Sequence, residues 1–332
     1  MSGIVVKDLV KTFHVAQRRQ GMLGAVSGLF VRRYRTVHAL DGVSFTIQPG
    51  ELVGYIGPNG AGKSTTVKVL SGILVPDSGS VQVLGMTPWK RRVDVVRQIG
   101  VVFGQRTQLW WDLPAIESFE LLRDIYNVPP PRYSSSLDEL VGLLELGELL
   151  DVPVRQLSLG QRMRCDLAAA LLHEPAILYL DEPTIGLDAV SKLAVRGFIR
   201  QLNQRRNLTV ILTTHDMDDI EALCPRVLMI HHGRILTDGS LEDLRAMVTR
   251  ERRLIIDLLD ENGLVEDPDA QLISRQGSRV TLRFDPLRTS PAELIARITA
   301  RHKVRDLFVE NPPIEEIIAA LYGQARSGQV EP

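Results

Sequence analysis

One eight-residue stretch, residues 57–64, limits what this chain can fold into more than any other. It reads Gly-Pro-Asn-Gly-Ala-Gly-Lys-Ser and matches the pattern G-x-x-x-x-G-K-[ST] of a phosphate-binding loop. Residues 52–56 form an apolar run of strand length before it, and a helical pattern starts after it at Thr65. A strand, a glycine-rich loop and a helix in this order predict a nucleoside triphosphate site. The alternative is a glycine turn that carries Lys-Ser by chance.

The residue types of this loop suit the binding of phosphate. Its glycines allow the backbone to turn so that several N–H groups point toward one anion. Lys63 adds a positive charge, and the hydroxyl of Ser64 is a ligand for Mg²⁺. The following helix directs the positive end of its dipole at the phosphates. We therefore expect contacts to the nucleotide from Gly57, Pro58, Asn59, Gly60, Ala61, Gly62, Lys63, Ser64 and Thr65.

Length, charge and cysteine usage restrict the class of protein. The 332 residues are enough for about two domains. The 39 Lys and Arg residues nearly balance the 40 Asp and Glu residues, so no overall field would gather nucleic acid, and none is expected as a partner. No signal peptide is visible, and the longest apolar stretch is far shorter than the roughly 20 residues of a membrane helix. Two isolated cysteines, Cys165 and Cys224, indicate reduced core thiols in an intracellular protein.

The chain is expected to form an α/β fold with two domains, residues 1–240 and 241–332. In the first, strand patterns at 4–10, 43–48, 52–56, 80–84, 176–180, 209–213 and 227–230 are separated by helical ones, which favours a mainly parallel sheet. Leu-rich helical spacing over 114–150 predicts a helical subdomain at about 106–160. The second domain shows strands at 253–257, 280–284 and 304–309 and helices at 291–300 and 314–322. We expect a small α+β accessory domain with a structural or regulatory role.

The basic segment 14–38 is unusual. No acidic residue occurs between Lys11 and Leu40, and the apolar residues there are spaced by three and four and flanked by arginines: Met22, Leu23, Val26, Leu29 and Phe30 between Arg18, Arg19, Arg32, Arg33 and Arg35. This pattern predicts an amphipathic helix that contacts lipid headgroups or a membrane partner. Three internal glycines weaken a helix, so a solvated loop with a small packing face is the alternative.

Further motifs follow the phosphate loop in a fixed order, and together they resemble the ATP-binding subunit of an ABC transporter over about residues 4–240. The apolar run 176–180 ends in Asp181 and Glu182 and resembles a Walker B strand. The resemblance implies that Asp181 holds Mg²⁺ and that Glu182 acts as general base toward water. It also implies ATP as the nucleotide and a P-loop ABC ATPase fold with a mainly parallel sheet, an antiparallel β subdomain and a helical insert.

Residues 157–161, Leu-Ser-Leu-Gly-Gln, resemble the family's signature motif, usually Leu-Ser-Gly-Gly-Gln. The resemblance implies that Ser158, Gly160 and Gln161 contact the γ-phosphate of ATP held by a second subunit, so catalysis would need a dimer, expected to be a homodimer. Leu159 departs from the usual glycine. Taken alone, this string is an ordinary helix start with Ser158 as the N-cap.

Three further residues acquire roles from the resemblance. His215 follows the strand 210–214 and matches the switch histidine, which contacts the γ-phosphate. Gln105 matches the Q-loop glutamine, whose carbonyl reaches Mg²⁺, and is expected in the catalytic set with Lys63, Glu182 and His215. Phe13, at the end of the first strand, matches the aromatic residue that stacks on adenine, with core packing as the alternative.

Two segments match the family's interfaces with other chains. Residues 186–188, Gly-Leu-Asp, resemble the D-loop that crosses the dimer interface, although Ile185 replaces a frequent serine. Trp110 and Trp111 lie where such subunits receive the coupling helix of a membrane partner. They would otherwise belong to the core of the helical insert.

The resemblance implies the motor subunit of a transporter, peripheral at the cytoplasmic face of the cell membrane and paired with membrane-spanning permease subunits. Residues 214–224 and 231–235 resemble exporters of the ABC-2 type, which handle drugs, lipids or polysaccharides. The alternatives are the ATPase of an importer, or a soluble ABC ATPase acting on ribosomes or nucleic acid. The soluble relatives usually carry two cassettes or a long coiled coil, and neither is visible here.

Overall fold

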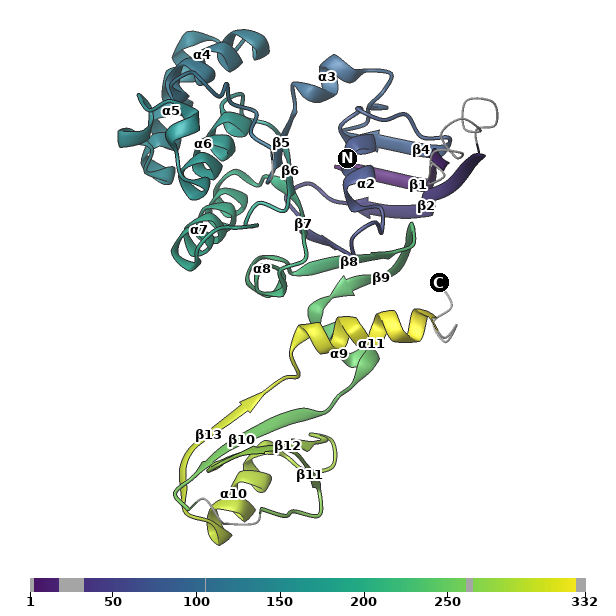
Figure 1. The fold of residues 1–332 in the computed structure, drawn as a ribbon, viewed down its shortest axis with the longest axis vertical. Helices are drawn as coiled ribbons and strands as arrows, with labels where there is room; N and C mark the ends of the chain where they lie inside the picture. Colours follow the sequence, from purple (N-terminus) through teal and green to yellow (C-terminus); the bar gives the residue numbers. More distant parts are fainter. Residues whose placement is uncertain (1–2, 18–32, 105, 261–264, 327–332) are drawn as a thin grey trace, which may run out of the picture. The chain divides into compact units, whose positions relative to one another are not determined.

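The computed structural model describes residues 3–17, 33–104, 106–260 and 265–326, with side chains from 3–15, 35–104, 106–260 and 265–324 (Figure 1). The chain divides between Gly239 and Ser240 into two compact units. Among the described residues no helix is long and apolar enough to cross a membrane.

A six-stranded sheet forms the centre of the first unit, in the order β5-β6-β7-β3-β8-β9. These strands are β3 (Leu52–Ile56), β5 (Ile99–Phe103), β6 (Ile177–Asp181), β7 (Thr209–Thr214), β8 (Arg226–His231) and β9 (Arg234–Ser240). From β5 to β8, neighbouring strands pair in parallel. Nearly all residues of β3, β6, β7 and β8 are buried, as expected for parallel strands covered on both faces.

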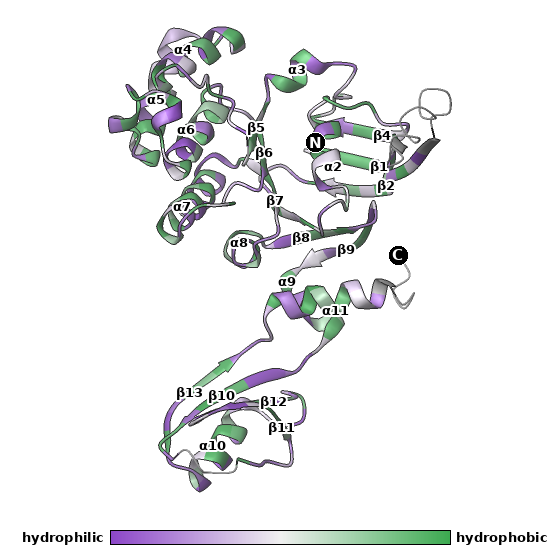
Figure 2. Cartoon of the chain, viewed as in Figure 1, coloured by the Kyte–Doolittle hydropathy of each residue, from purple (hydrophilic) through white to green (hydrophobic). Residues whose placement is uncertain are grey.

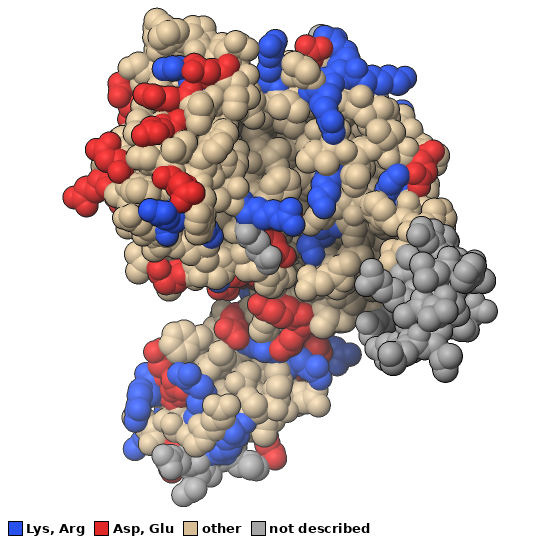
Figure 3. Space-filling view, turned by 45° about the horizontal axis from the view of Figure 1, so that its top comes forward, with Lys and Arg blue, Asp and Glu red and all other residues tan. Residues whose placement is uncertain are grey.

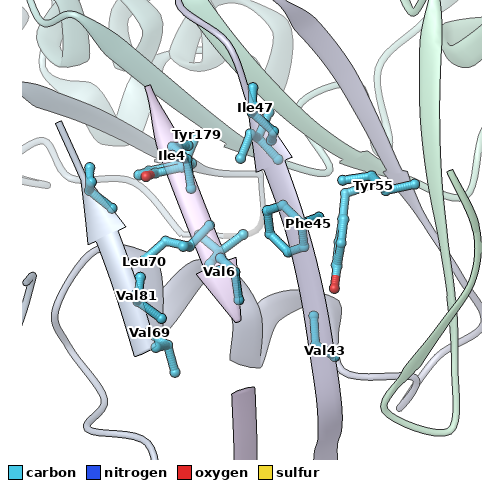
Figure 4. Packing of buried hydrophobic residues seen from close by; sticks show 14 of the residues in the cluster. Ile4, Val6, Val43, Phe45, Ile47, Tyr55, Val69, Leu70, Val81 and Tyr179 are labelled. Carbon is cyan, nitrogen blue, oxygen red and sulfur yellow. The ribbon is translucent and has the colours of Figure 1, made fainter. Parts of the chain in front are cut away.

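A second, antiparallel sheet has the order β2-β1-β4 and contains β1 (Ile4–Gln17), β2 (Arg33–Ile47) and β4 (Ser78–Val83). The main hydrophobic core joins both sheets to α2 (Lys63–Leu70). Figure 4 shows Phe45 of the antiparallel sheet between Val6 of β1 and Tyr55 of β3, and the ring centres of Phe45 and Tyr55 lie 5.9 Å apart. The helix that follows the phosphate loop is thus anchored in the core through Val69 and Leu70.

The basic segment differs from what its spacing predicts, because both of its ends are strands. Strand β1 continues to Gln17 and β2 begins at Arg33, so 14–17 and 33–38 are neither helix nor loop. Residue pairs such as His14 with Thr36 and Val15 with Arg35 extend the ladder. Backbone pairing and β-branched residues such as Val15 and Thr36 explain why these ends are strands. The apolar residues from Met22 to Phe30 lie outside the described residues.

The helical part of the first unit contains α4 (Ala115–Tyr126), α5 (Pro130–Leu144), α6 (Leu159–Leu171) and α7 (Ala189–Arg206), with short turns at Gly147–Leu149 and Val154–Gln156. Figure 2 shows hydrophilic and hydrophobic residues on each of these helices, as expected where one face is buried. Two further short helices among the described residues are α3 (Arg92–Val96) and α8 (Met217–Leu223). In the face shown by Figure 3, acidic side chains gather over the helical part and basic ones on the side of α3.

The second unit has a four-stranded antiparallel sheet in the order β11-β12-β10-β13. Its elements are α9 (Leu241–Val248), β10 (Arg252–Leu258), β11 (Ala270–Gln276), β12 (Arg279–Phe284), α10 (Pro291–Arg301), β13 (Val304–Glu310) and α11 (Ile314–Arg326). Alternate residues of β10 and β12 pack with Leu294 and Ile298 of α10 in a separate core. The sequence patterns predict these elements except α9 and β11. Strand β11 was missed because most of its residues are exposed and show no alternation.

Candidate active site

The residues expected to act on the nucleotide follow the carboxyl ends of adjacent parallel strands. The phosphate loop follows β3, Asp181 ends β6, and His215 follows β7. In the sheet these strands lie in the order β6-β7-β3, so all three ends meet at one edge. The carboxyl edge of an open α/β sheet is where such folds bind ligands.

Backbone geometry explains two glycines of the phosphate loop. A Cβ atom at Gly57 would lie 2.4 Å from the carbonyl oxygen of Ile230. Gly62 has a φ of +116°, and a Cβ there would lie 2.5 Å from the carbonyl oxygen of Ala39. Both positions therefore exclude a side chain, and α2 starts directly after Gly62. The loop thus ends at a helix N-terminus that favours an anion.

Lys63 is held inside the loop. It is 7% exposed, and its Nζ donates hydrogen bonds to the carbonyl oxygens of Gly57 at 2.6 Å and Pro58 at 3.3 Å. Burial lowers the pKa of Lys63, while the carboxylates of Glu182 and Asp181 raise it. The ammonium therefore lies close to both acidic residues that the sequence placed in the site.

Ser64 and Asp181 form an oxygen-rich pair that suits a hard cation. The Ser64 hydroxyl donates to Oδ2 of Asp181 at 3.1 Å, although the two are 117 residues apart in sequence. Thr213 of β7 also donates to Asp181. No group of three or more His, Cys, Asp or Glu that could hold a metal occurs in the described part of the chain. A Mg²⁺ ion here would therefore share the Ser64 and Asp181 oxygens with phosphate and water, as Mg²⁺ commonly does.

Glu182 and His215 are paired. The Nδ1 atom of His215 lies 3.1 Å from Oε1 of Glu182. The side chain of Glu182 is 20% exposed and that of His215 is 59% exposed, so a substrate can reach the pair from solvent. The geometry suits a carboxylate that takes a proton from water with an imidazole beside it.

The backbone at Glu182 is strained and is held from two sides. Its φ is +56°, in the left-handed region that side chains other than glycine seldom adopt. The N–H of Glu182 donates to the Thr213 carbonyl at 2.8 Å, and the N–H of Gly104 donates to the Asp181 carbonyl at 2.8 Å. A Cβ atom at Gly104 would lie 2.0 Å from the carbonyl oxygen of Glu182. Neither Gly104 nor Thr213 was predicted to have a role; a glycine just after β5 and a threonine near the end of β7 were the available signals.

The expected signature residues lie elsewhere in the unit, at the start of α6. Ser158 caps the helix: its hydroxyl accepts from the N–H of Gln161 at 3.2 Å, and the Gln161 side chain accepts from the N–H of Ser158 at 2.9 Å. Within this chain Ser158 is therefore the N-cap of α6. Both of these hydrogen bonds join Ser158 to Gln161, and neither involves the phosphate loop. A Cβ at Gly160 would lie 2.6 Å from Oγ of Ser191, so this glycine packs closely against the start of α7.

Leu159 contacts the expected D-loop. A Cβ atom built on Gly186 would lie 2.9 Å from the Leu159 side chain. Gly186 has a φ of +72°, and Asp188 caps α7 through the N–H of Ser191 at 2.8 Å. The signature turn and the expected D-loop therefore pack together, and the side chain that replaces the usual glycine takes part in this packing.

Two predicted site residues remain, Gln105 and Phe13. Gln105 lies outside the described residues. Phe13 lies within β1 rather than at its end, is half-buried, and has the Lys11 ammonium 5.7 Å from its ring centre. The strand extends beyond Phe13 because it pairs with β2 as far as Arg33.

The two expected interface tryptophans are on the surface. Trp110 is 39% exposed and Trp111 is 51% exposed, so they do not form the core of the helical part. The guanidinium of Arg162 lies 5.7 Å from the Trp111 ring centre, and the backbone N–H of Trp110 donates to the Ser118 hydroxyl at 3.1 Å. An exposed pair of indoles suits an interaction surface.

Both cysteines are buried and free, as their apolar neighbours predicted. Burial raises the pKa of the Cys165 thiol to about 12 and also raises the pKa of Cys224. Thiols that stay protonated are poor nucleophiles and poor metal ligands. Neither cysteine is therefore a candidate for catalysis.

Comparison with known proteins agrees with this geometry. The family profile described as "ABC transporter" matches residues 40–185. The chain is 33% identical over 306 residues to the daunorubicin resistance ATP-binding protein DrrA3 of Streptomyces coeruleorubidus, covering 89% of this chain and 94% of that one. It is 29% identical over 315 residues to the methionine import ATP-binding protein MetN of Latilactobacillus sakei, covering 91% and 90%.

A solved structure agrees as well. The dimeric structure of the ATP-binding cassette MJ0796 in a post-hydrolysis state with ADP and Pi aligns with a TM-score of 0.59 and 26% identity, covering 71% of this chain and 98% of that one. The similarity thus extends from the sequence to the three-dimensional arrangement of the cassette. The chain belongs to the ABC transporter family, as an ATP-binding subunit with the family's ATPase activity.

Proposed function

We propose that this chain is the motor subunit of an exporter and that two copies close on ATP and Mg²⁺ to drive a separate membrane permease. The observation that carries the proposal is the meeting of Lys63, Ser64, Asp181, Glu182 and His215 at one edge of the sheet. ABC ATP-binding subunits dimerise and pair with membrane permeases. We place this subunit at the cytoplasmic face of the cell membrane, as a peripheral protein bound to its permease.

The residues of the edge divide the work on ATP between them. The loop N–H groups and Lys63 bind the phosphates and oppose the charge that develops on the γ-phosphoryl group. Ser64 and Asp181 would hold Mg²⁺, with Gln105 as a further ligand, and the ion supplies charge neutralisation when bound. Glu182 orients water and accepts its proton. His215 contacts both the Glu182 carboxylate and the γ-phosphate and so fixes their relative position. Phe13 contacts the adenine ring.

The pocket is completed by a second copy. Ser158, Gly160 and Gln161 start α6 at the surface of one copy and meet the γ-phosphate of the other. Two features support this arrangement: the turn packs on Gly186 and Ser191, and two hydrophobic residues close to Ser191 in sequence are exposed, Val190 at 77% and Leu193 at 65%. Apolar side chains so close to a polar turn are explained by a partner surface.

Drug-like, lipid or polysaccharide export is the proposed direction of transport. The stretch after His215 supports it, and so does the relative named for daunorubicin resistance, whose similarity continues into the second unit. A methionine importer matches over a comparable length, so import is the competing direction. The test is to identify the permease that co-purifies with the chain and to follow export of a fluorescent drug from cells that express both. Uptake instead of efflux would contradict export.

The motor mechanism is tested with Glu182→Gln. We expect this variant to bind ATP but to lose roughly 10²- to 10⁴-fold in turnover, and its ATP-bound dimer to accumulate in light scattering. Glu145→Gln is the matched control, because Glu145 also has a positive φ, +52°, but ends α5 at the surface. It should turn over ATP like the parent chain. Equal turnover in Glu182→Gln would remove Glu182 from the base role, and monomers at saturating ATP would contradict the composite pocket.

A further inference from the structure

The buried carboxylate of Asp166 connects α6 to the segment that follows residue 105. Asp166 is 4% exposed, and its Oδ1 accepts hydrogen bonds from the Thr107 hydroxyl at 2.8 Å and the Gln108 N–H at 3.1 Å. The Gln108 side chain donates to the Asp166 carbonyl at 2.9 Å, and the Leu109 N–H donates to the Thr107 hydroxyl at 3.1 Å. The Asp166 side chain thus holds two consecutive residues of the segment, and the third, Leu109, is bound to it through Thr107.

The same segment is also bound to the chain just before α6. The N–H of Val154 donates to the Leu113 carbonyl, and the N–H of Arg155 donates to the Trp111 carbonyl, both at 3.0 Å. Arg155 also pairs with Asp112 at 2.9 Å. Residues 107–113 are therefore joined to both sides of Ser158: to 154–155 before it and to Asp166 two turns after it.

A buried carboxylate at position 166 costs free energy unless hydrogen bonds compensate it, and the segment 107–108 supplies such bonds. The neighbouring residues 167–170 of α6 are buried and apolar, so packing alone would be served by another apolar residue. Burial raises the pKa of Asp166 to about 6, against the hydrogen bonds from Thr107 and Gln108. The hydrogen bonds to the segment offset part of the cost of the buried charge, and they are a reason for a carboxylate to stand at this position.

We propose that Asp166 is a positioning residue for ATP hydrolysis: it makes residues 107–111 and α6 move as one body, so that a displacement at the exposed Trp110 and Trp111 reaches Ser158. Without Asp166 the segment would keep its contacts to residues 154–155 but lose its connection to α6, so the helix that Ser158 caps would follow the displacement incompletely. The inference rests on the proposed role of Ser158 at the partner's nucleotide.

The connection itself is tested by hydrogen exchange in the full-length chain. In Asp166→Ala the amides of Gln108 and Leu109 should exchange at least about tenfold faster than in the parent. The Gln108 amide loses its acceptor, and the Leu109 amide loses protection because Thr107, its acceptor, is no longer held by Asp166. Asp166→Asn keeps an acceptor oxygen and should stay close to the parent. Ser118→Ala is the matched control, since it frees the Trp110 N–H from α4 and leaves α6 untouched. Unchanged exchange at Gln108 in Asp166→Ala would overturn the proposal.

Its effect on catalysis is tested with the same variants. We expect Asp166→Ala to bind ATP with a Kd within about twofold of the parent and to lose about tenfold in kcat, while Asp166→Asn and Ser118→Ala keep kcat. In a Trp89→Phe background, where Trp110 and Trp111 are the remaining tryptophans, Asp166→Ala should lose the ATP-dependent change in fluorescence. Equal loss of kcat in Ser118→Ala would overturn the proposal. Full activity of Ser158→Ala would instead contradict the composite pocket, and the exchange result would still stand.

Discussion

The imidazole of His215 lies 3.1 Å from the carboxylate of Glu182, although 33 residues separate them in sequence. The sheet brings them together, because β6 and β7 are parallel neighbours and Asp181 is in register with Thr213. Each residue comes directly after its strand. The pair therefore depends on the pairing of two strands and not on a flexible loop.

We expect His215→Ala to lower kcat by roughly 10²-fold while ATP binding is retained, because the carboxylate of Glu182 loses the group that orients it. The measurement is steady-state ATP hydrolysis together with a direct ATP titration. His302→Ala is the control, since His302 ends α10 in the second unit. A parallel loss of ATP affinity would assign His215 to binding and not to the chemical step.

Gly104→Ala should abolish most of the ATP turnover, because the added methyl group displaces the backbone of Glu182. Its Cβ would lie 2.0 Å from the carbonyl oxygen of Glu182, so the strained backbone at Glu182 has to move. A shift of about 1 Å in a catalytic group costs on the order of 10²-fold in rate. The measurement is ATP hydrolysis by purified protein at matched folded concentration.

Gly142→Ala is the counterpart of this variant. Gly142 lies inside α5, and a Cβ atom there would meet no described atom within 4 Å beyond its own helix backbone and chain neighbours. Alanine should raise the unfolding free energy by up to about 1 kcal/mol and leave turnover unchanged. If both glycine variants lost activity equally, the close contact of Gly104 with Glu182 would not be the cause.

Residues with a chemical pattern were predictable, whereas contacts between distant segments were not. Gly57 to Ser64, Asp181 and Glu182 stand in contiguous motifs, so their place at one sheet edge follows from the order of the strands. Gly104, Thr213 and Asp166 act through backbone or buried hydrogen bonds with residues far away in sequence. A single sequence carries no record of such pairings.

The same reason explains the errors in the fold. The ends of the segment 14–38 form strands because β1 and β2 pair there, a nonlocal interaction, while the residues with helical spacing lie outside the described ones. Strand β11 has mostly exposed residues, so no alternation marks it, and it forms because β12 offers a ladder to pair with. Local patterns could place β3 and β6 because their residues are apolar and buried, apart from Asp181 at the end of β6.

Asp219 is expected to contribute strongly to the stability of the first unit. It is fully buried on α8 and pairs with Arg196 of α7, and it also accepts hydrogen bonds from Thr184 and Thr214. Asp219→Ala would leave the Arg196 charge without this partner and should cost roughly 3 kcal/mol or more of unfolding free energy. Thr184 lies two residues after Glu182, and Thr214 directly precedes His215. Loss of their shared acceptor should therefore disturb the catalytic pair and lower turnover as well.

Asp94→Ala is the control for this ion pair. Asp94 pairs with Arg91 at 2.8 Å on the surface, with both side chains largely exposed, so its loss should change stability by less than about 1 kcal/mol. Chemical denaturation followed by far-UV circular dichroism compares the two variants. Equal effects would show that the Asp219 pair contributes no more than a surface pair.

The buried Asp166 should give the first unit a pH dependence of a definite sign. Burial raises the pKa of its carboxyl to about 6 in the folded chain, whereas an unfolded chain titrates near the ordinary value of about 3.9. Between these values the folded state binds more protons than the unfolded state, so the contribution of Asp166 to stability falls as the pH rises through this window. Asp166→Asn removes the titrating group and keeps an acceptor for Thr107 and Gln108. Relative to the parent, the variant should gain roughly 1 to 3 kcal/mol between pH 4 and pH 7.

Asp267 provides the comparison of opposite sign. Its carboxylate accepts two hydrogen bonds from the Arg297 guanidinium, both at 2.8 Å, and this pairing lowers the pKa of Asp267. Stability from a lowered pKa is present above the unfolded value and is lost as the pH falls, so Asp267→Asn should lose stability relative to the parent at pH 7 and less of it in acid. Thermal unfolding of both variants and the parent between pH 4 and pH 7 tests the pair. Parallel Tm curves for Asp166→Asn and the parent would show that Asp166 does not titrate in this range, and that its hydrogen bonds compensate for its burial.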